Sequence, residues 1–105
     1  MKLRNLDVTN KEEVDFLIRV YLEAFPLSER RSLERVFELY KNNSDFTIAL
    51  TVYQVKPVGF LCYWDLGDFV FAEYLAIDPT LRNGGLGKKV VNEFLASITK
   101  PVILE

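Results

Sequence analysis

The chain has 105 residues, half of them hydrophobic, so it has enough apolar material to form one small domain with its own core. Its formal net charge is −2 at pH 7 and its basic residues are scattered, which argues against a nucleic-acid-binding surface. One cysteine and no histidine exclude an internal disulfide, a His-based catalytic triad and the usual zinc ligand sets, so no metal site is expected.

No apolar segment approaches the roughly 20 residues that a membrane-spanning helix needs, and the first residues do not lead into the apolar stretch of a signal peptide. Cys62 alternates with Phe60 and Trp64, which predicts a buried core position. A single cysteine also fits a reducing compartment, so we expect a cytoplasmic protein without a membrane or nucleic-acid partner.

Residues 2–8 form a short mixed segment that is typical of an edge strand. A helix should follow, because Thr9 and Asn10 each precede a glutamate by three residues, which is the spacing of a capping box. Pro26 ends this helix, since the residue before a proline is displaced from the α region. The apolar residues that recur at helical spacing, and that we expect to face the core, are Val14, Leu17, Ile18, Tyr21, Leu22 and Phe25.

A second helix is expected to begin after either Ser28 or Ser32, both suitable capping residues, and to end at residues 42–43. Its core-facing residues should be Leu33, Val36, Phe37 and Tyr40. After this helix the hydrophobic period changes from helical to alternating, which predicts that strands follow.

Residues 46–53 and 58–64 alternate in hydrophobicity and predict two antiparallel strands joined by a turn at Lys56-Pro57. Residues 69–77 predict a third strand that is apolar on both faces and therefore central. An amphipathic helix with Leu86, Val90, Val91, Phe94, Leu95 and Ile98 on one side comes next. Residues 102–104 begin a further strand, and the order strand, helix, strand predicts that it runs parallel to its neighbour.

Three glycines, Gly84, Gly85 and Gly87, lie between the third strand and the amphipathic helix. Glycine permits a positive φ and lets a ligand approach bare backbone, and the first N–H groups of a helix together with its dipole attract an anion. The loop therefore predicts a phosphate site, with Lys88 adding positive charge. The alternative is a structural turn between strand and helix. The dinucleotide fingerprint and the P-loop have different glycine spacings and fit poorly.

Arg82-x-x-Gly85-x-Gly87, preceded by the strand end Leu75-Ala76-Ile77-Asp78-Pro79, resembles the R/Q-x-x-G-x-G/A signature of the GNAT superfamily of acyl-CoA-dependent N-acetyltransferases. The order of the predicted elements agrees over nearly the whole chain. The resemblance implies an α+β fold with a mixed sheet, mostly antiparallel, and a parallel strand after the signature helix. We expect residues 1–105 to be a single domain of this kind.

The resemblance also implies acetyl-CoA as the cofactor. The residues expected to hold the pyrophosphate of coenzyme A are Arg82, Asn83, Gly84, Gly85, Leu86, Gly87 and Lys88. The main chain of Leu75, Ala76 and Ile77 is expected to pair with pantetheine as an added strand would. The acceptor, a small-molecule or peptide amine, would then attack the thioester directly.

Glu73 is the candidate catalytic base, since strand alternation would place its carboxylate on one face with Phe69, Phe71, Leu75 and Ile77, where apolar neighbours favour proton uptake. The alternative is a carboxylate at a polar rim or paired with an arginine, and a bulge in this strand would change the face. Glu29 and Arg30, with Arg31 beside them, lie where the family often builds its acceptor pocket, although they also fit a solvated helix start. Tyr63 and Tyr74 fit either core or cleft positions.

The family continues beyond its parallel strand with another helix and two strands, which commonly supply a tyrosine that protonates the leaving thiolate. This chain stops at Glu105, so we expect a domain that is incomplete at its C-terminus, with a candidate homodimer interface at the strand over residues 102–105. Three hypotheses remain open: an N-acetyltransferase that uses acetyl-CoA, a non-catalytic acyl-CoA-binding or assembly module, and an interaction domain without a ligand.

Overall fold

The computed structural model describes residues 1–104, except for the side chains of Arg82 and Asn83 and the surroundings of Gly84. Its centre is a five-stranded sheet with the order β1-β2-β3-β4-β5. Neighbouring strands are antiparallel except β4 and β5, which are parallel. The strands are β1 (Lys2–Asn5), β2 (Phe46–Tyr53), β3 (Lys56–Asp65), β4 (Val70–Ile77) and β5 (Val102–Leu104).

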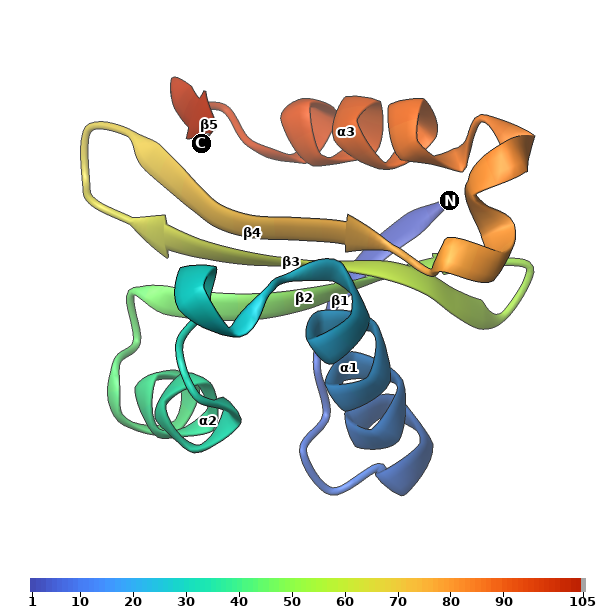
Figure 1. Cartoon of the computed structure of the whole chain (residues 1–105). Helices are drawn as coiled ribbons and strands as arrows, with labels where there is room; N and C mark the ends of the chain where they lie inside the picture. Colours follow the sequence, from blue (N-terminus) through green and yellow to red (C-terminus); the bar gives the residue numbers. More distant parts are fainter. Residues whose placement is uncertain (105) are drawn as a thin grey trace.

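Helices cover both faces of this sheet. Figure 1 shows α1 (Lys11–Ala24) and α2 (Leu33–Asn42) on one face and α3 (Leu86–Ser97) on the other. Two 3-10 turns, η1 (Leu27–Glu29) and η2 (Pro79–Gly84), connect α1 to α2 and β4 to α3. Across residues 1–104, every helix is too short or too polar to cross a membrane. The predicted mixed sheet with one parallel strand after the third helix is confirmed.

Asn10 begins α1, because its side chain accepts a hydrogen bond from the backbone N–H of Glu13. The other half of the expected capping box is absent. The Glu13 carboxylate instead accepts from Arg4 at 2.7 Å and from the backbone N–H of Asp7 at 3.2 Å, and so ties the end of β1 to the helix. The predicted end of the helix is confirmed, since Phe25 is extended before Pro26.

The predicted apolar face of α1 is partly wrong. Leu17 and Tyr21 are buried as expected, but Leu22 is 42% exposed, and Phe16 and Val20 take the core positions instead. Apolar residues occupy a wide arc of this helix, opposite a polar strip of Glu12, Asp15, Arg19 and Glu23, so periodicity alone did not select which part of the arc faces the core. The sheet selects it, because Phe16, Leu17, Val20 and Tyr21 pack with residues of β2 and β3.

Ser32, not Ser28, caps α2 by accepting from the backbone N–H of Arg35 at 3.1 Å. Of the residues expected to face the core, Val36 is buried, and Leu33, Phe37 and Tyr40 are partly buried against the same cluster. Leu39 is also buried and was not predicted.

The turn between β2 and β3 lies at Gln54-Val55 and not at Lys56-Pro57. Both turn residues have a positive φ, 52° and 63°, and β3 already begins at Lys56. Pro57 pairs with Val52 beside a register shift, a position that suits a residue without a backbone donor.

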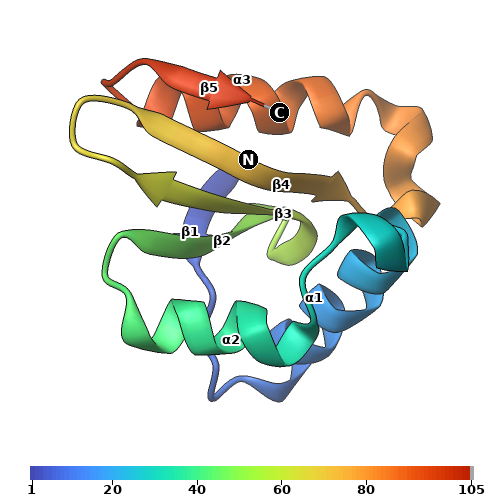
Figure 2. The same cartoon turned by 60° about the vertical axis from the view of Figure 1, so that its left-hand side comes forward.

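The sheet separates two apolar clusters. One lies under α1 and α2 and contains Cys62, which is fully buried as predicted, and burial raises the pKa of its thiol. The other lies under α3 and is centred on Val90 and Phe94. Figure 2 shows the same layering from the side, with β4 between α3 and the segment that joins α1 to α2. The C-terminal half of β4 is therefore where all layers of the fold approach one another.

Candidate functional site

The glycine segment forms an abrupt entry into α3. The backbone of Arg82, Asn83 and Gly84 belongs to η2, and Gly85 then adopts a left-handed conformation, with φ 71° and ψ 15°. Gly85 is also the N-cap of α3 and offers no side-chain cap, and a β-carbon built at Gly85 would have no described atom within 4 Å. The N–H groups in the first turn of α3 have no partner within the helix and are directed toward its N-terminal end. The side chains of Arg82 and Asn83 lie outside the described part of the structure.

Asp78 anchors the beginning of η2. Asp78 is 6% exposed, and its carboxylate accepts from the backbone N–H and hydroxyl of Thr80, at 3.0 and 2.9 Å. Arg19 of α1 donates to both oxygens, at 2.8 and 3.3 Å. The Arg19 guanidinium, helped by Thr80, lowers the pKa of Asp78 to about 2. In the sequence Asp78 marks the end of a strand, and an aspartate before Pro79-Thr80 is also a capping signal for the turn that follows.

A hollow of about 330 Å³ joins the glycine segment to the end of β4. Its lining residues are Ala24, Phe25, Leu75, Ala76, Ile77 and Gly87. A β-carbon built at Gly87 would meet Ile77 at 3.9 Å and no other described atom within 4 Å, so the backbone at the start of α3 is open on this side. Three of the predicted cofactor residues, Leu75, Ala76 and Ile77, therefore share one hollow with Gly87, which comes ten residues after Ile77.

One edge of β4 is open along this hollow. In the described chain, β5 pairs only with Val70, Phe71 and Ala72, at the other end of the strand. On the opposite edge the Asp78 N–H bonds to Val58 at 2.9 Å. Because hydrogen-bonded and non-bonded pairs alternate in an antiparallel ladder, Leu75 and Ile77 direct their backbone N–H and C=O groups to the open edge. This backbone fits a ligand with amide groups, as pantetheine has.

A bulge in β4 changes the expected position of Glu73. Cys62 pairs with Tyr74, whereas the next residue of β3, Tyr63, pairs with Ala72, so Glu73 is the extra residue. The expectation that Glu73 shares an apolar face with Leu75 and Ile77 is wrong. Leu75 and Ile77 belong to the cluster under α3, and the carboxylate of Glu73 lies on the opposite face with Tyr74.

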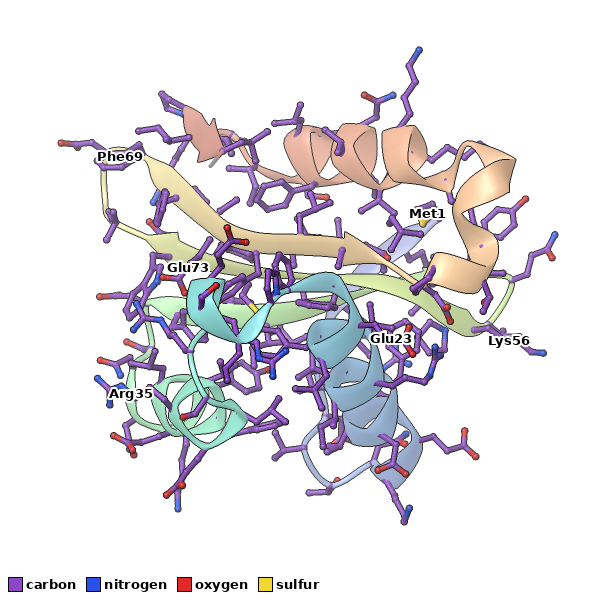
Figure 3. All side chains as sticks on the ribbon, in the orientation of Figure 1. Met1, Glu23, Arg35, Lys56, Phe69 and Glu73 are labelled. Atoms are coloured by element: carbon purple, nitrogen blue, oxygen red, sulfur yellow. The ribbon has the colours of Figure 1, made fainter. Side chains whose placement is uncertain are left out.

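Glu73 forms an ion pair with Arg31, the last residue but one before α2. The guanidinium Nε and Nη2 donate to the two carboxylate oxygens at 3.1 and 2.9 Å. The Glu73 side chain is 13% exposed and that of Arg31 is 39% exposed. Figure 3 shows Glu73 between β4 and the segment that carries η1. The arginine partner that the sequence left as an alternative for this carboxylate is thus present.

A second hollow, of about 660 Å³, opens over this ion pair. Its lining residues are Phe25, Ser28, Glu29, Arg30, Arg31, Glu73 and Tyr74. Phe25 also lines the first hollow, and its ring lies 4.9 Å from that of Tyr74, centroid to centroid. The two hollows therefore lie on either side of Phe25. Tyr74 is both a core and a cleft residue, which answers the question that the sequence left open.

Hydrogen bonds fix the wall of the second hollow. The backbone N–H of Arg31 donates to the Tyr74 hydroxyl at 3.0 Å, and the Tyr21 hydroxyl donates to the Arg31 carbonyl at 2.8 Å. Burial raises the pKa of Tyr21, so its hydroxyl keeps the proton that it donates. Sequence reasoning placed Arg31 beside the acceptor pocket but did not include it in the candidate site, because its partner comes from a strand 42 residues later.

Glu29 and Arg30, the predicted acceptor residues, both line this hollow. Arg30 also has a structural role, since its Nη1 donates to the carbonyls of Leu22 and Phe25, at 3.2 and 2.6 Å, and so completes the C-terminus of α1. Glu29 is exposed. The arrangement brings together the open start of α3, the open edge of β4 and a charged hollow beyond Phe25.

The chain belongs to the acetyltransferase (GNAT) family, whose family model matches residues 14–100. A solved structure of a candidate GNAT-family acetyltransferase from Bacteroides thetaiotaomicron is similar to 99% of the chain, with a TM-score of 0.94 and 28% sequence identity. No curated protein matches the chain in sequence. The predicted family and fold are confirmed.

Two further structures share the fold at 22% identity over 92% of the chain. One is an aminoglycoside 6'-N-acetyltransferase complexed with coenzyme A, with a TM-score of 0.68. The other is the aminoglycoside 6'-N-acetyltransferase from Enterococcus faecium, with a TM-score of 0.65. The chain covers 59% of the Bacteroides protein and 54% of each of these two, so it spans little more than half the length of these related structures.

Proposed function

We propose that this chain binds acetyl-CoA and belongs to an N-acetyltransferase that acetylates a primary amine of a small molecule or peptide. The observation that carries the proposal is the continuity of the site. A bare helix start at Gly85, an open strand edge at Leu75 and Ile77, and a charged hollow at Glu73 follow one another around Phe25. This order suits a ligand with a pyrophosphate, an amide-containing arm and a reactive end.

The coenzyme would be held mainly by backbone. N–H groups of the segment from Asn83 to Lys88 would bind the pyrophosphate, where the α3 dipole favours negative charge and the Lys88 side chain is exposed. Leu75 and Ile77 would bind the amides of pantetheine through their outward N–H and C=O groups. Arg82 is proposed to contribute its charge to the same anion, as the family signature implies.

Acetyl-CoA would supply an acetyl thioester, from which the amine forms an amide bond while the C–S bond breaks, with release of coenzyme A thiol and one proton from the acceptor ammonium. Glu73 is proposed to receive that proton. Arg31 occupies one lone pair on each carboxylate oxygen, so the second lone pair of either oxygen remains available to the proton. Glu29 and Arg30 are proposed to contact the acceptor.

The test combines binding and turnover on one sample. A thermal-shift titration with coenzyme A should raise the melting temperature, because a ligand at 100 times its dissociation constant adds about 2.7 kcal/mol of stability. Release of free thiol from acetyl-CoA is then measured across a panel of amines. Binding with amine-dependent thiol release supports the enzyme. Binding without amine-dependent release supports a non-catalytic module, and no binding at millimolar coenzyme A contradicts the cofactor assignment.

A further inference from the structure

The guanidinium of Arg31 has one edge engaged and one edge open. Its Nε and Nη2 bind the two oxygens of Glu73, which uses two of the five N–H donors of an arginine. Nη1, which carries two more donors, has no hydrogen-bond partner among the described residues. Nη1 and the remaining N–H of Nη2 form the open edge of the guanidinium. Their spacing suits a carboxylate or phosphate that accepts two parallel hydrogen bonds.

The ion pair presents its cationic partner to solvent. The Arg31 side chain is 39% exposed, whereas Glu73 is 13% exposed, and both line the hollow of about 660 Å³. A ligand that enters this hollow therefore meets the guanidinium more readily than the carboxylate. Since Glu73 neutralises the pair but does not cover it, an anionic group can bind Arg31 without displacing Glu73.

Arg31 is also held in place before any ligand arrives. Tyr74 and Tyr21 bind its backbone N–H and C=O on either side, and Tyr21 is 1% exposed. The carboxylate of Glu73 fixes the direction of the side chain. A donor edge that is already ordered loses little conformational entropy when it binds an anion, which favours affinity.

The remaining charges of this hollow do not favour a polycation. Arg30 adds a second guanidinium, and the other carboxylate of the lining, Glu29, is exposed at the rim. The four charged residues of the lining therefore sum to zero. An acceptor with several ammonium groups and no anion would meet as many cations as carboxylates here and would gain little net attraction.

We propose that the acceptor is an amine that also carries a carboxylate or phosphate group, with that group bound to the open edge of Arg31. This inference rests on the proposed acetyl transfer and adds the chemical class of its acceptor. With the anion at the open edge of Arg31, the amine would lie beside Glu73 and Tyr74, on the side of this hollow that faces Phe25 and the end of β4.

The experiment uses matched amines that differ in one group. β-Alanine is compared with β-alaninamide for a carboxylate, and O-phosphoethanolamine with ethanolamine for a phosphate, while spermidine and kanamycin represent polycations. Dissociation constants are measured by calorimetry with the chain saturated with coenzyme A. We expect at least one of the two amines that carry an anionic group to bind ten times more tightly than its counterpart without that group. The pair that shows this difference identifies carboxylate or phosphate as the preferred group.

Variants then locate the preference. Arg31→Gln should abolish the difference within the responding pair, and Arg31→Lys should reduce it while retaining the charge. Arg35→Gln, in the exposed arginine of α2, is the matched control and should leave the difference unchanged. The ¹H–¹⁵N signal of Arg31 Nε, assigned by its loss in Arg31→Lys, should shift on titration with the anionic amine and report binding even where a variant is unstable.

The inference is overturned if both members of each pair bind equally, if the polycations bind best, or if no amine of the panel binds to the coenzyme complex. It is also overturned if the ten-fold preference survives in Arg31→Gln. A failure of coenzyme A itself to bind is a different result, because it contradicts the proposed function and appears in the first titration, before any amine is added.

Discussion

Arg19 and Asp78, 59 residues apart in the sequence, form a two-point ion pair that fastens α1 to the start of η2. Asp78 in turn binds the backbone N–H and hydroxyl of Thr80. The segment that we propose for the pyrophosphate is therefore held at one end by a helix from the other half of the chain. Because α1 also carries Phe25 at its end, one helix organises both sides of the site.

Asp78→Asn should lower the free energy of unfolding by about 1 to 2 kcal/mol at pH 7. This is less than the lowered pKa of Asp78 would imply by itself, because Arg19 is half exposed and solvent screens its charge. The pKa of Asp78 is lowered from 3.8 to about 2, so its contribution is complete above pH 3.8 and is lost as the pH falls through about 2. Denaturant unfolding at pH 7, 4 and 2 measures the difference, which should shrink between the last two. Asp15→Asn, in the exposed pair with Lys11, should have little effect. A constant difference down to pH 2 contradicts the ion-pair explanation.

Gly87→Glu should weaken binding of coenzyme A at least ten-fold and leave the fold intact. A β-carbon here meets Ile77 at 3.9 Å and no other described atom within 4 Å, and an acidic residue in the first turn of a helix is stabilising. The free energy of unfolding should therefore stay equal or rise. The same charge repels a pyrophosphate. Gly87→Ala is the control, because the family signature admits alanine, and it should bind normally. Equal binding by Gly87→Glu and wild type means that the segment is only a structural turn.

Glu73→Gln should lower the rate of acetyl transfer by about 10²-fold, which is the low end for a general base, and leave the dissociation constant of coenzyme A unchanged. The amide cannot take the proton, but it still offers one oxygen to Arg31. Initial rates at saturating acetyl-CoA, together with a coenzyme titration, separate the two effects. Unchanged rates would leave Glu73 with the single role of orienting Arg31.

Gly59→Ala should destabilise the fold by about 1 to 3 kcal/mol, the usual cost of overpacking a core. Its β-carbon would lie 2.6 Å from the carbonyl oxygen of Ala76 and 2.8 Å from Ile77 Cδ1, and the backbone oxygen cannot move without disturbing the β3–β4 ladder. Thermal unfolding compares this variant with Gly87→Ala, where the new methyl group has room. A melting temperature equal to that of wild type would show that β4 adjusts without penalty.

Replacing Gln54-Val55 by Asn-Gly should stabilise the hairpin between β2 and β3 by about 1 kcal/mol. Both residues have a positive φ, which a β-branched valine adopts only with strain and which Asn-Gly favours. Val55 is 93% exposed, so no core contact is lost. Val55→Ala keeps the positive φ at a residue with a β-carbon and should recover only part of the gain. A lower melting temperature for Asn-Gly would mean that this turn is not strained.

Local sequence signals determined most of the framework of this protein. Asn10 and Ser32 mark helix starts because their short side chains bind the free N–H groups there, and Pro26 ends α1 because of its own ring. Alternation over residues 46–53 predicted β2, and the spacing of Gly85 and Gly87 after β4 predicted the family, since a helix start without side chains is a local property. The family model then confirmed that prediction.

Tertiary structure decided which face each element presents and which charges meet. The core-facing side of α1 depends on packing against the sheet, because the apolar arc of that helix is wider than the part that the core covers. The bulge at Glu73 depends on register between β3 and β4, and it reverses the side on which the carboxylate lies. Arg31 with Glu73, and Arg19 with Asp78, are pairs between residues 42 and 59 positions apart. Local propensity cannot predict such partners, because only the folded sheet brings them within hydrogen-bonding distance.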